Sequence, residues 1–277
     1  MKTLQELTLL DKFLFDEAME DTETYEALLR IILGDEQLQL LTAAQTEKEI
    51  RTMPWLRSIR VDVFSMDLLG TIYNTEMQKE KREDLIRRTR YYQALIDSSL
   101  LEPGVVNYNS MNNTTIIMIM PFDLFGLGRY VYTFEEVCTE DNSLKMNDGA
   151  KRIFVNTHGT NKEDFSVEFV ALMEFVEYNR DIDTDMQGNN LSKIIQRVSQ
   201  LKANEEVGVR YMQKWEEEIL IKEEGREEGR EEGKTETSIE YISNLMKNMN
   251  LSAEDAMKIL SIPKEEYAKY LKILMDK

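Results

Sequence analysis

The segment Ile59–Gln78 constrains the fold of this chain most strongly, because it reads as a single β-hairpin. Two apolar runs flank an Asp-Leu-Leu-Gly turn at positions 67–70. Asp62 lies in the first predicted strand among β-branched and aromatic neighbours, so we expect it to be buried on at least one side. In an antiparallel pairing across this turn, Asp62 comes level with Glu76, and Gln78 shares a face with Glu76. The hairpin therefore brings two carboxylates together within a sheet.

Two carboxylates that point inward from neighbouring strands indicate a cation bound between or beside them, because buried acids are seldom unpaired. The chain contains one histidine, His158, and one cysteine, Cys138, which excludes a zinc site of the usual His/Cys kind and a nuclease built on paired histidines. A bound metal would therefore have oxygen ligands, and Mg²⁺ held by a few carboxylates, water and phosphate is the candidate. From the residues alone, the alternative is that Asp62 pairs with Arg60 or Arg90 and only holds the fold.

The net charge of −18, with a pI of about 4.6, argues against a nucleic-acid partner for the chain as a whole. Positions 79–90 depart from this average, with six basic residues against three acidic ones, a local balance of +3. The basic residues are Lys79, Lys81, Arg82, Arg87, Arg88 and Arg90. This segment directly follows the hairpin, so one face beside the carboxylates could accept phosphate. The alternative is an ordinary solvated helix face.

Periodicity along the chain alternates helical and strand-like segments, which is typical of an α/β layer arrangement. Helices are predicted at Leu4–Leu33, Arg82–Leu101, Asp164–Tyr178 and Leu191–Glu224. Besides the hairpin, strands are predicted at Leu38–Leu41, Thr114–Pro121, Tyr130–Phe134 and Arg152–Asn156. The continuous apolar run at Thr114–Pro121 indicates a buried central strand. This order places the carboxylates on a central sheet that the helix at Arg82–Leu101 covers.

The C-terminal part has a different composition, because Glu223–Lys234 repeats Glu-Glu-Gly followed by Arg or Lys three times. Its glycines, Gly225, Gly229 and Gly233, each cost a helix about 1 kcal/mol. The repeat reads either as a solvated helical linker or as a Gly-lined face where two helices approach in self-association. We expect three parts in the chain: a domain at 1–213, the charged repeat at 214–237 and a small helical tail at 238–277. The C-terminal helices are the predicted surface for a homodimer or higher homo-oligomer.

Short motifs along the chain resemble a known family. Asp62, Glu76 and Gln78 resemble the active-site signature of PD-(D/E)XK nucleases, which is an Asp on one strand and Glu-x-Lys on the next. More narrowly, the chain resembles the recombination-promoting nuclease (Rpn) family, also described as PD-(D/E)XK nuclease family transposases. The segments that carry this resemblance are Asp11–Phe15, Arg60–Val63, Asn74–Gln78, Arg90–Gln93, Arg152–Thr157 and the Glu-Glu-Gly-Arg repeat.

The resemblance implies a PD-(D/E)XK core of helix, three strands, helix and strand, with a mixed sheet flanked by helices and a helical C-terminal extension. It also implies a divalent-metal DNA endonuclease, in which Asp62 and Glu76 would bind Mg²⁺ or Mn²⁺ and Gln78 would complete the catalytic set. The superfamily usually has lysine at the position of Gln78, whereas the Rpn-like pattern carries glutamine. The residues implied to contact DNA are Lys79, Arg87, Arg90 and Tyr92.

The apolar runs of the chain are too short to cross a bilayer, the longest being Ile116–Met120. The lone Cys138 fits a reducing compartment, so we expect a cytoplasmic protein that has no membrane partner. The expected function is Mg²⁺-dependent hydrolysis of DNA, associated with recombination or mobile elements. The alternative is a catalytically weak protein of nuclease fold that acts through binding and oligomerisation.

Overall fold

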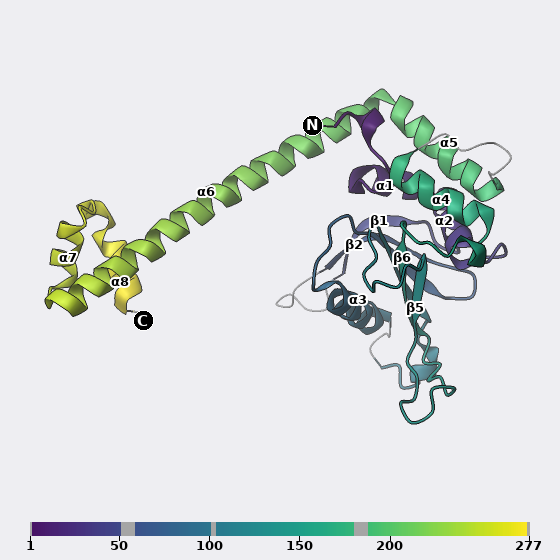
Figure 1. Cartoon of the computed structure of the whole chain (residues 1–277), viewed down its shortest axis with the longest axis horizontal. Coiled ribbons are helices and arrows are strands. Elements are labelled where there is room, and N and C mark those ends of the chain that lie inside the picture. Colours follow the sequence, from purple (N-terminus) through teal and green to yellow (C-terminus); the bar gives the residue numbers. More distant parts are fainter. Residues whose placement is uncertain (1, 51–58, 101–103, 180–187, 276–277) are drawn as a thin grey trace. The chain divides into compact units, whose positions relative to one another are not determined.

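The computed structural model of the chain describes residues 2–50, 59–100, 104–179 and 188–275 (Figure 1). The chain divides into two compact units, Met1–Gly208 and Val209–Lys277. The first unit contains the sheet and all the predicted site residues, and the described part of the second unit is mainly helical.

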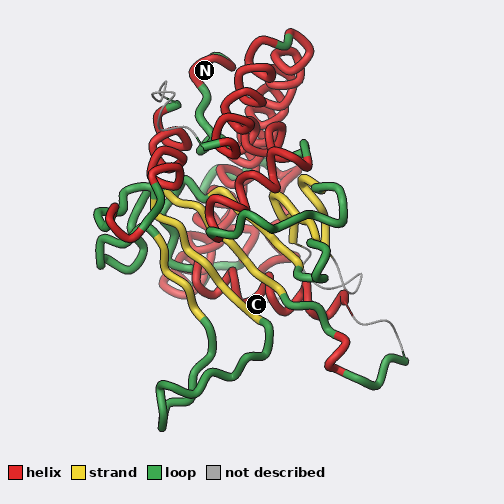
Figure 2. The backbone as a smooth tube through the Cα atoms, turned by 90° about the vertical axis from the view of Figure 1, so that its right-hand side faces the viewer, coloured by secondary structure: helices red, strands yellow, loops and turns green. Residues whose placement is uncertain are grey.

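A mixed sheet forms the centre of the first unit, and the described residues contribute six strands in the order β1-β2-β3-β4-β6-β5 (Figure 2). The strands are β1 (Gln45–Ile50), β2 (Ile59–Met66), β3 (Ile72–Met77), β4 (Thr114–Met120), β5 (Val131–Phe134) and β6 (Ala150–Asn156). The pairs β1–β2, β2–β3 and β5–β6 are antiparallel, and the pairs β3–β4 and β4–β6 are parallel. The α/β class expected from the sequence is therefore confirmed.

The predicted hairpin is present as β2 and β3, joined by the Asp-Leu-Leu-Gly turn at 67–70. Gly70 has a φ of +82°, which glycine adopts without the strain that a side chain would bring. The paired residues run from Met66 and Ile72 at the turn to Val63 and Thr75. Every residue of β4 is buried, as its continuous apolar sequence predicts. Because β3 lies directly beside β4, the second strand of the hairpin runs through the interior of the sheet.

Helices cover both faces of this sheet (Figures 1 and 2). The helix α3 (Leu85–Leu100) lies on one face, where Tyr92, Leu95 and Ile96 pack in one cluster with apolar residues of the strands, among them Val61 and Ile116. The helices of the other face are α1 (Lys12–Met19), α2 (Thr22–Leu33), α4 (Val167–Tyr178) and α5 (Asn189–Ala203). The predicted helix at Arg82–Leu101 thus corresponds to α3, and Leu101 lies outside the described residues.

The prediction of one continuous helix at Leu4–Leu33 is wrong, because the segment divides into a short 3₁₀ helix, α1 and α2. Two aspartates explain the breaks by accepting local backbone N–H groups. The Asp11 carboxylate accepts the N–H of Thr8 at 3.0 Å, and the Asp21 carboxylate accepts the N–H of Thr24 at 2.9 Å as the N-cap of α2. Gly34 ends α2 in a left-handed conformation, as its sequence position predicts.

The short strand predicted at Leu38–Leu41 is also wrong, since this segment forms only an isolated bridge between Leu40 and Asp67. The strand that occupies the edge beside β2 is β1, with the mostly polar sequence Gln-Thr-Glu-Lys-Glu-Ile. An edge strand faces solvent along much of its length, so it lacks the apolar pattern that marks an internal strand. For this reason the sequence gives little sign of β1.

The second unit is built on the end of a long helix, α6 (Glu205–Met249), whose residues from Val209 on belong to it. The helices α7 (Ala253–Ile259) and α8 (Tyr267–Met275) pack on it through an apolar cluster. The buried members of this cluster are Ile239, Ile242, Ala256, Met257 and Tyr270. The single helix predicted at Leu191–Glu224 is wrong, because α5 ends at Ala203 and the Asn204 side chain accepts the N–H of Glu206 at 2.8 Å.

The three glycines of the charged repeat lie within α6. A Cβ atom at Gly225, Gly229 or Gly233 would meet no other atom within 4 Å, so among the described residues nothing packs on this face. Over the described part of the chain, we find no helix that combines the length and the apolar character needed to cross a bilayer.

Gly159, in the loop after β6, is expected to tolerate no side chain. A Cβ atom there would lie 2.2 Å from Cγ and 2.6 Å from Cα of Tyr130, and the backbone atom cannot move without disturbing the start of β5. We expect Gly159→Ala to destabilise the fold by about 3 kcal/mol, as overpacking against a backbone does. Thermal unfolding followed by circular dichroism measures this. Gly208→Ala is the control, because a Cβ atom at this helical position meets open space, and equal melting temperatures of the two variants would contradict the expectation.

Candidate functional site

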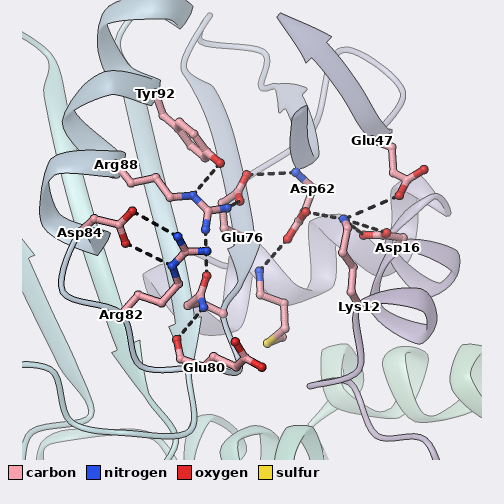
Figure 3. Close-up of polar contacts among 12 residues, drawn as sticks. Lys12, Asp16, Glu47, Asp62, Glu76, Glu80, Arg82, Asp84, Arg88 and Tyr92 are labelled. Atoms are coloured by element: carbon pink, nitrogen blue, oxygen red, sulfur yellow. Dashed lines mark hydrogen bonds and ion pairs between the residues drawn. The ribbon is translucent and has the colours of Figure 1, made fainter. Parts of the chain in front are cut away.

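Asp62 and Glu76 lie side by side at the point where the β2–β3 ladder stops (Figure 3). One step beyond the last paired residues, Val63 and Thr75, the two carboxylates replace the backbone carbonyls as hydrogen-bond acceptors. The Asp62 carboxylate accepts the N–H of Met77 at 3.0 Å, and the Glu76 carboxylate accepts the N–H of Asp62 at 3.0 Å. Asp62 is 6% exposed and Glu76 is 1% exposed. The hairpin register predicted from the sequence therefore does bring these two acids together.

The cation beside Asp62 is Lys12, the first residue of α1. Its ammonium group contacts the Asp62 carboxylate and also lies 3.0 Å from Asp16 and 3.9 Å from Glu47. Burial on its own would lower the pKa of Lys12, but the charges of Asp62 and Asp16 outweigh it and raise the pKa above its ordinary value. Lys12 therefore carries a full positive charge at neutral pH.

The cation beside Glu76 is Arg88 of α3, which binds three side chains at once (Figure 3). Its guanidinium donates to the Glu76 carboxylate at 3.1 Å, to the Gln78 amide oxygen at 3.0 Å and to the Tyr92 hydroxyl at 2.7 Å. The Gln78 amide nitrogen in turn donates to the Glu80 carbonyl at 2.6 Å. Arg88 thus ties the end of β3 to the helix that covers it.

The pKa of the Glu76 carboxyl group is raised well above its ordinary value. Its burial, together with the nearby charge of Asp62, raises the pKa of Glu76 from 4.5 to about 8. The N–H of Asp62 and the charges of Arg88 and Lys12 act in the opposite direction without cancelling this rise. A buried carboxyl group with a pKa near neutrality, next to a second carboxylate, is a common feature of functional sites.

A basic cleft of about 650 Å³ opens beside this cluster, between the start of β2 and the first turns of α3. Its polar lining is Arg60, Arg82, Asp84, Arg87, Arg88, Tyr91 and Tyr92, and Ile59 lines it as well. The lining thus contains four arginines and one acidic residue. Because Arg88 belongs both to this cleft and to the carboxylate cluster, the cleft and the buried acids are neighbours.

The residues predicted to contact DNA are distributed unevenly around this site. Arg87 and Tyr92 line the cleft, with Tyr92 largely buried beneath the guanidinium of Arg88. Arg90 is exposed on α3 and is not part of the lining. Lys79 forms an ion pair with Asp11 at 2.7 Å.

Two residues of the cluster were not predicted as site residues: Arg88 was only one of six basic residues at 79–90, and Lys12 was only part of the segment Asp11–Phe15. Arg88 had a signal, because it lies three residues after Leu85 and four before Tyr92, on the buried side of α3. For Lys12 the only signal was its place in the segment Asp11–Phe15, because it meets Asp62 through the packing of α1 on the sheet. The cation that the structure gives Asp62 is thus neither of the arginines considered as its partner.

The donor atoms of this site fit a hard divalent cation, although the set is small. Asp62 and Glu76 supply carboxylate oxygens, the type that Mg²⁺ prefers, and water and phosphate can complete its coordination. Among the described residues no group of three or more acidic, His or Cys side chains could hold a metal. A metal would therefore rely on these two acids, and it would compete with the Lys12 ammonium for Asp62.

Comparison of the chain with protein-family models, with curated proteins and with solved structures gives no match. The site described above therefore has to be interpreted from its own residues.

Proposed function

We propose that this protein is a divalent-metal-dependent DNA endonuclease with a PD-(D/E)XK core, associated with recombination or mobile elements. The observation that carries the proposal is the pair of buried carboxylates, Asp62 and Glu76, beside a cleft lined by four arginines. The element order α2-β1-β2-β3-α3-β4 supports it, because helix, three strands, helix and strand is the order that the resemblance implies. The proposal is thus consistent with both the topology and the chemistry of the site.

In this proposal Asp62 and Glu76 would hold Mg²⁺ or Mn²⁺, and the bound metal would supply an activated water and a positive charge beside the phosphate. Gln78 is a neutral amide and supplies no positive charge. The ammonium of Lys12 provides that charge from the other side of Asp62. Arg88 orients Glu76 and Gln78 together, since it donates to both.

Plasmid nicking in the presence of Mg²⁺ or Mn²⁺ tests the proposal. We expect the wild type to nick supercoiled DNA, EDTA to stop the reaction, and Asp62→Ala and Glu76→Ala to be inactive. Asp164→Ala, which changes an exposed acid far along the sequence, serves as the control. Equal cleavage by the wild type and both site variants would rule the proposal out.

A second candidate is a catalytically weak protein of the same fold that acts through binding and self-association. The observation that favours it is that Lys12 and Arg88 already contact the two acids that a metal would need. The Gly-lined face of α6 offers a surface for a homodimer. Calorimetry separates the two candidates: absent heat of binding at millimolar Mg²⁺, together with a dimer in analytical ultracentrifugation, would favour this one.

The Lys12→Gln variant is expected to bind Mg²⁺ about tenfold more tightly than the wild type. Lys12 competes for Asp62, and removing one like charge near contact is worth at least about 1.4 kcal/mol in a partly hydrated site, which is about tenfold in affinity. Isothermal titration calorimetry at fixed ionic strength measures the change. Lys48→Gln is the matched control, because Lys48 lies over the Phe64 ring, 3.7 Å from its centroid, on the neighbouring strand. Unchanged affinity in Lys12→Gln would show that the metal does not use Asp62.

A further inference from the structure

We propose that the cleft between β2 and α3 binds a single-stranded segment of DNA, with its phosphates on Arg60, Arg82 and Arg87 and an unpaired base on Tyr91. That the polyanion is DNA rests on the proposed nuclease function, and the single-stranded form is inferred from the cleft itself.

The charge of the cleft is suited to phosphate. Arg60, Arg82, Arg87 and Arg88 face a single acid, Asp84, in a chain whose net charge is −18. Arginine binds phosphate through two parallel N–H groups, which gives geometric fit as well as charge. In the structure Arg82 forms an exposed ion pair with Asp84, with 3.3 Å between Nε and Oδ1. Because an exposed ion pair contributes little stability, a phosphate can readily replace Asp84.

The more exposed of the two tyrosines in the cleft, Tyr91, favours a single strand over a duplex. Tyr91 is 38% exposed and lies next to Arg87 and Arg88 in the lining. In a duplex the base faces are stacked on one another, so a tyrosine ring at the surface reaches them only where a strand is unpaired or a base is turned out. Base stacking on an aromatic ring together with arginine contacts to the backbone is the usual composition of single-strand sites.

The volume of the cleft also favours single-stranded DNA as the ligand. A cleft of about 650 Å³ is in the range of small-molecule sites, so it suits a short stretch of one strand. A duplex without sequence-specific contacts depends on many phosphate contacts over a wide basic surface, which a chain with such a negative balance opposes. The strand would lie close to Glu76, because Arg88 contacts both that carboxylate and the cleft.

The test is fluorescence anisotropy of the full chain with a labelled single-stranded oligonucleotide and a hairpin duplex of matched sequence, in EDTA. We expect the wild type to bind the single strand at least tenfold more tightly. Tyr91→Ala is expected to weaken single-strand binding about tenfold, while Tyr91→Phe keeps the ring and the affinity. Arg60→Ala and Arg87→Ala are each expected to reduce the slope of log affinity against log salt by about 0.7.

The controls are Tyr108→Ala, which removes a tyrosine that is 74% exposed outside the cleft, and Arg129→Ala, which removes an exposed arginine outside it. Equal affinity for the two DNA forms, or equal effects of Tyr91→Ala and Tyr108→Ala, would overturn the inference. Because binding is measured in EDTA, it is separate from hydrolysis. If the protein nicks plasmid DNA but binds the two DNA forms equally in EDTA, this inference alone is overturned. If it binds the single strand preferentially through Tyr91 but does not nick plasmid DNA, this inference is upheld and the nuclease proposal fails.

Discussion

Replacing Glu76 by glutamine is expected to abolish metal-dependent nicking and to remove the loss of stability that the wild type shows as pH rises to alkaline values. Glutamine keeps the shape of the side chain and can still accept the N–H of Asp62 through its amide oxygen, but its amide nitrogen cannot accept from Arg88. It has no charge with which to hold a divalent cation, and such a cation contributes several kcal/mol to catalysis, so nicking should fall at least about 1000-fold. Glu83→Gln, which removes an exposed acid nearby, is the matched control.

The change in pH dependence follows from the pKa of Glu76, which is about 8 in the folded protein and 4.5 as an ordinary value. The folded state therefore holds a proton that the unfolded chain releases, and stability falls as pH rises from about 4.5 to about 8. Each unit of this pKa difference is worth about 1.4 kcal/mol. Urea unfolding at pH 5 and pH 9 should show Glu76→Gln gaining on the wild type at the higher pH. Parallel pH profiles of the two proteins would contradict the assigned pKa.

Removing Arg88 is expected to cause the largest loss of stability among the site variants, about 3 kcal/mol for Arg88→Ala at pH 9. The substitution leaves Glu76 buried without its cation and deprives Gln78 and Tyr92 of a donor. At pH 6.5 the cost should be smaller, because Glu76 then carries a proton and needs no counter-charge. Urea unfolding at the two pH values measures both quantities.

Arg87→Ala is the matched control for this experiment, since Arg87 is the preceding residue of α3 and is exposed. It should leave stability within about 0.5 kcal/mol of the wild type, as most surface substitutions do. Arg88→Lys keeps a positive charge but cannot reach three partners in one plane, so an intermediate loss is expected. A cost of Arg88→Ala that is the same at both pH values would show that ionised Glu76 is not its main partner.

The sequence predicted those parts of the fold whose signal is local. The hairpin at Ile59–Gln78 has a turn of suitable residues between two apolar runs, and β4 has an uninterrupted apolar sequence. It did not predict β1, because an edge strand is stabilised by pairing with β2 rather than by its own polar residues. The division of Leu4–Leu33 depended on hydrogen bonds of Asp11 and Asp21, which apolar periodicity does not register.

The site divides in the same way. The register of one hairpin is enough to bring Asp62 and Glu76 together, so the sequence predicted the pair. The position of Arg88 depends on the rotation of α3 about its axis, where one residue is a turn of about 100°, and the predicted contacts Arg87 and Arg90 lie on other sides of it. The position of Lys12 beside Asp62 depends on how α1 packs on the sheet, and this packing cannot be predicted from a short segment of sequence.

The carboxylates of Asp62 and Glu76 also act as part of the sheet, since each accepts a backbone N–H that the β2–β3 ladder leaves over. A descendant of this protein that lost catalysis would therefore still need both acids, because losing either one exposes an unpaired amide in the interior. Arg60, Arg82 and Arg87 of the cleft are exposed, so replacing them should cost the fold little, unlike replacing Arg88. Among related chains, the change from a nuclease to a binding protein would be recorded first at those cationic positions, while the acidic pair persisted.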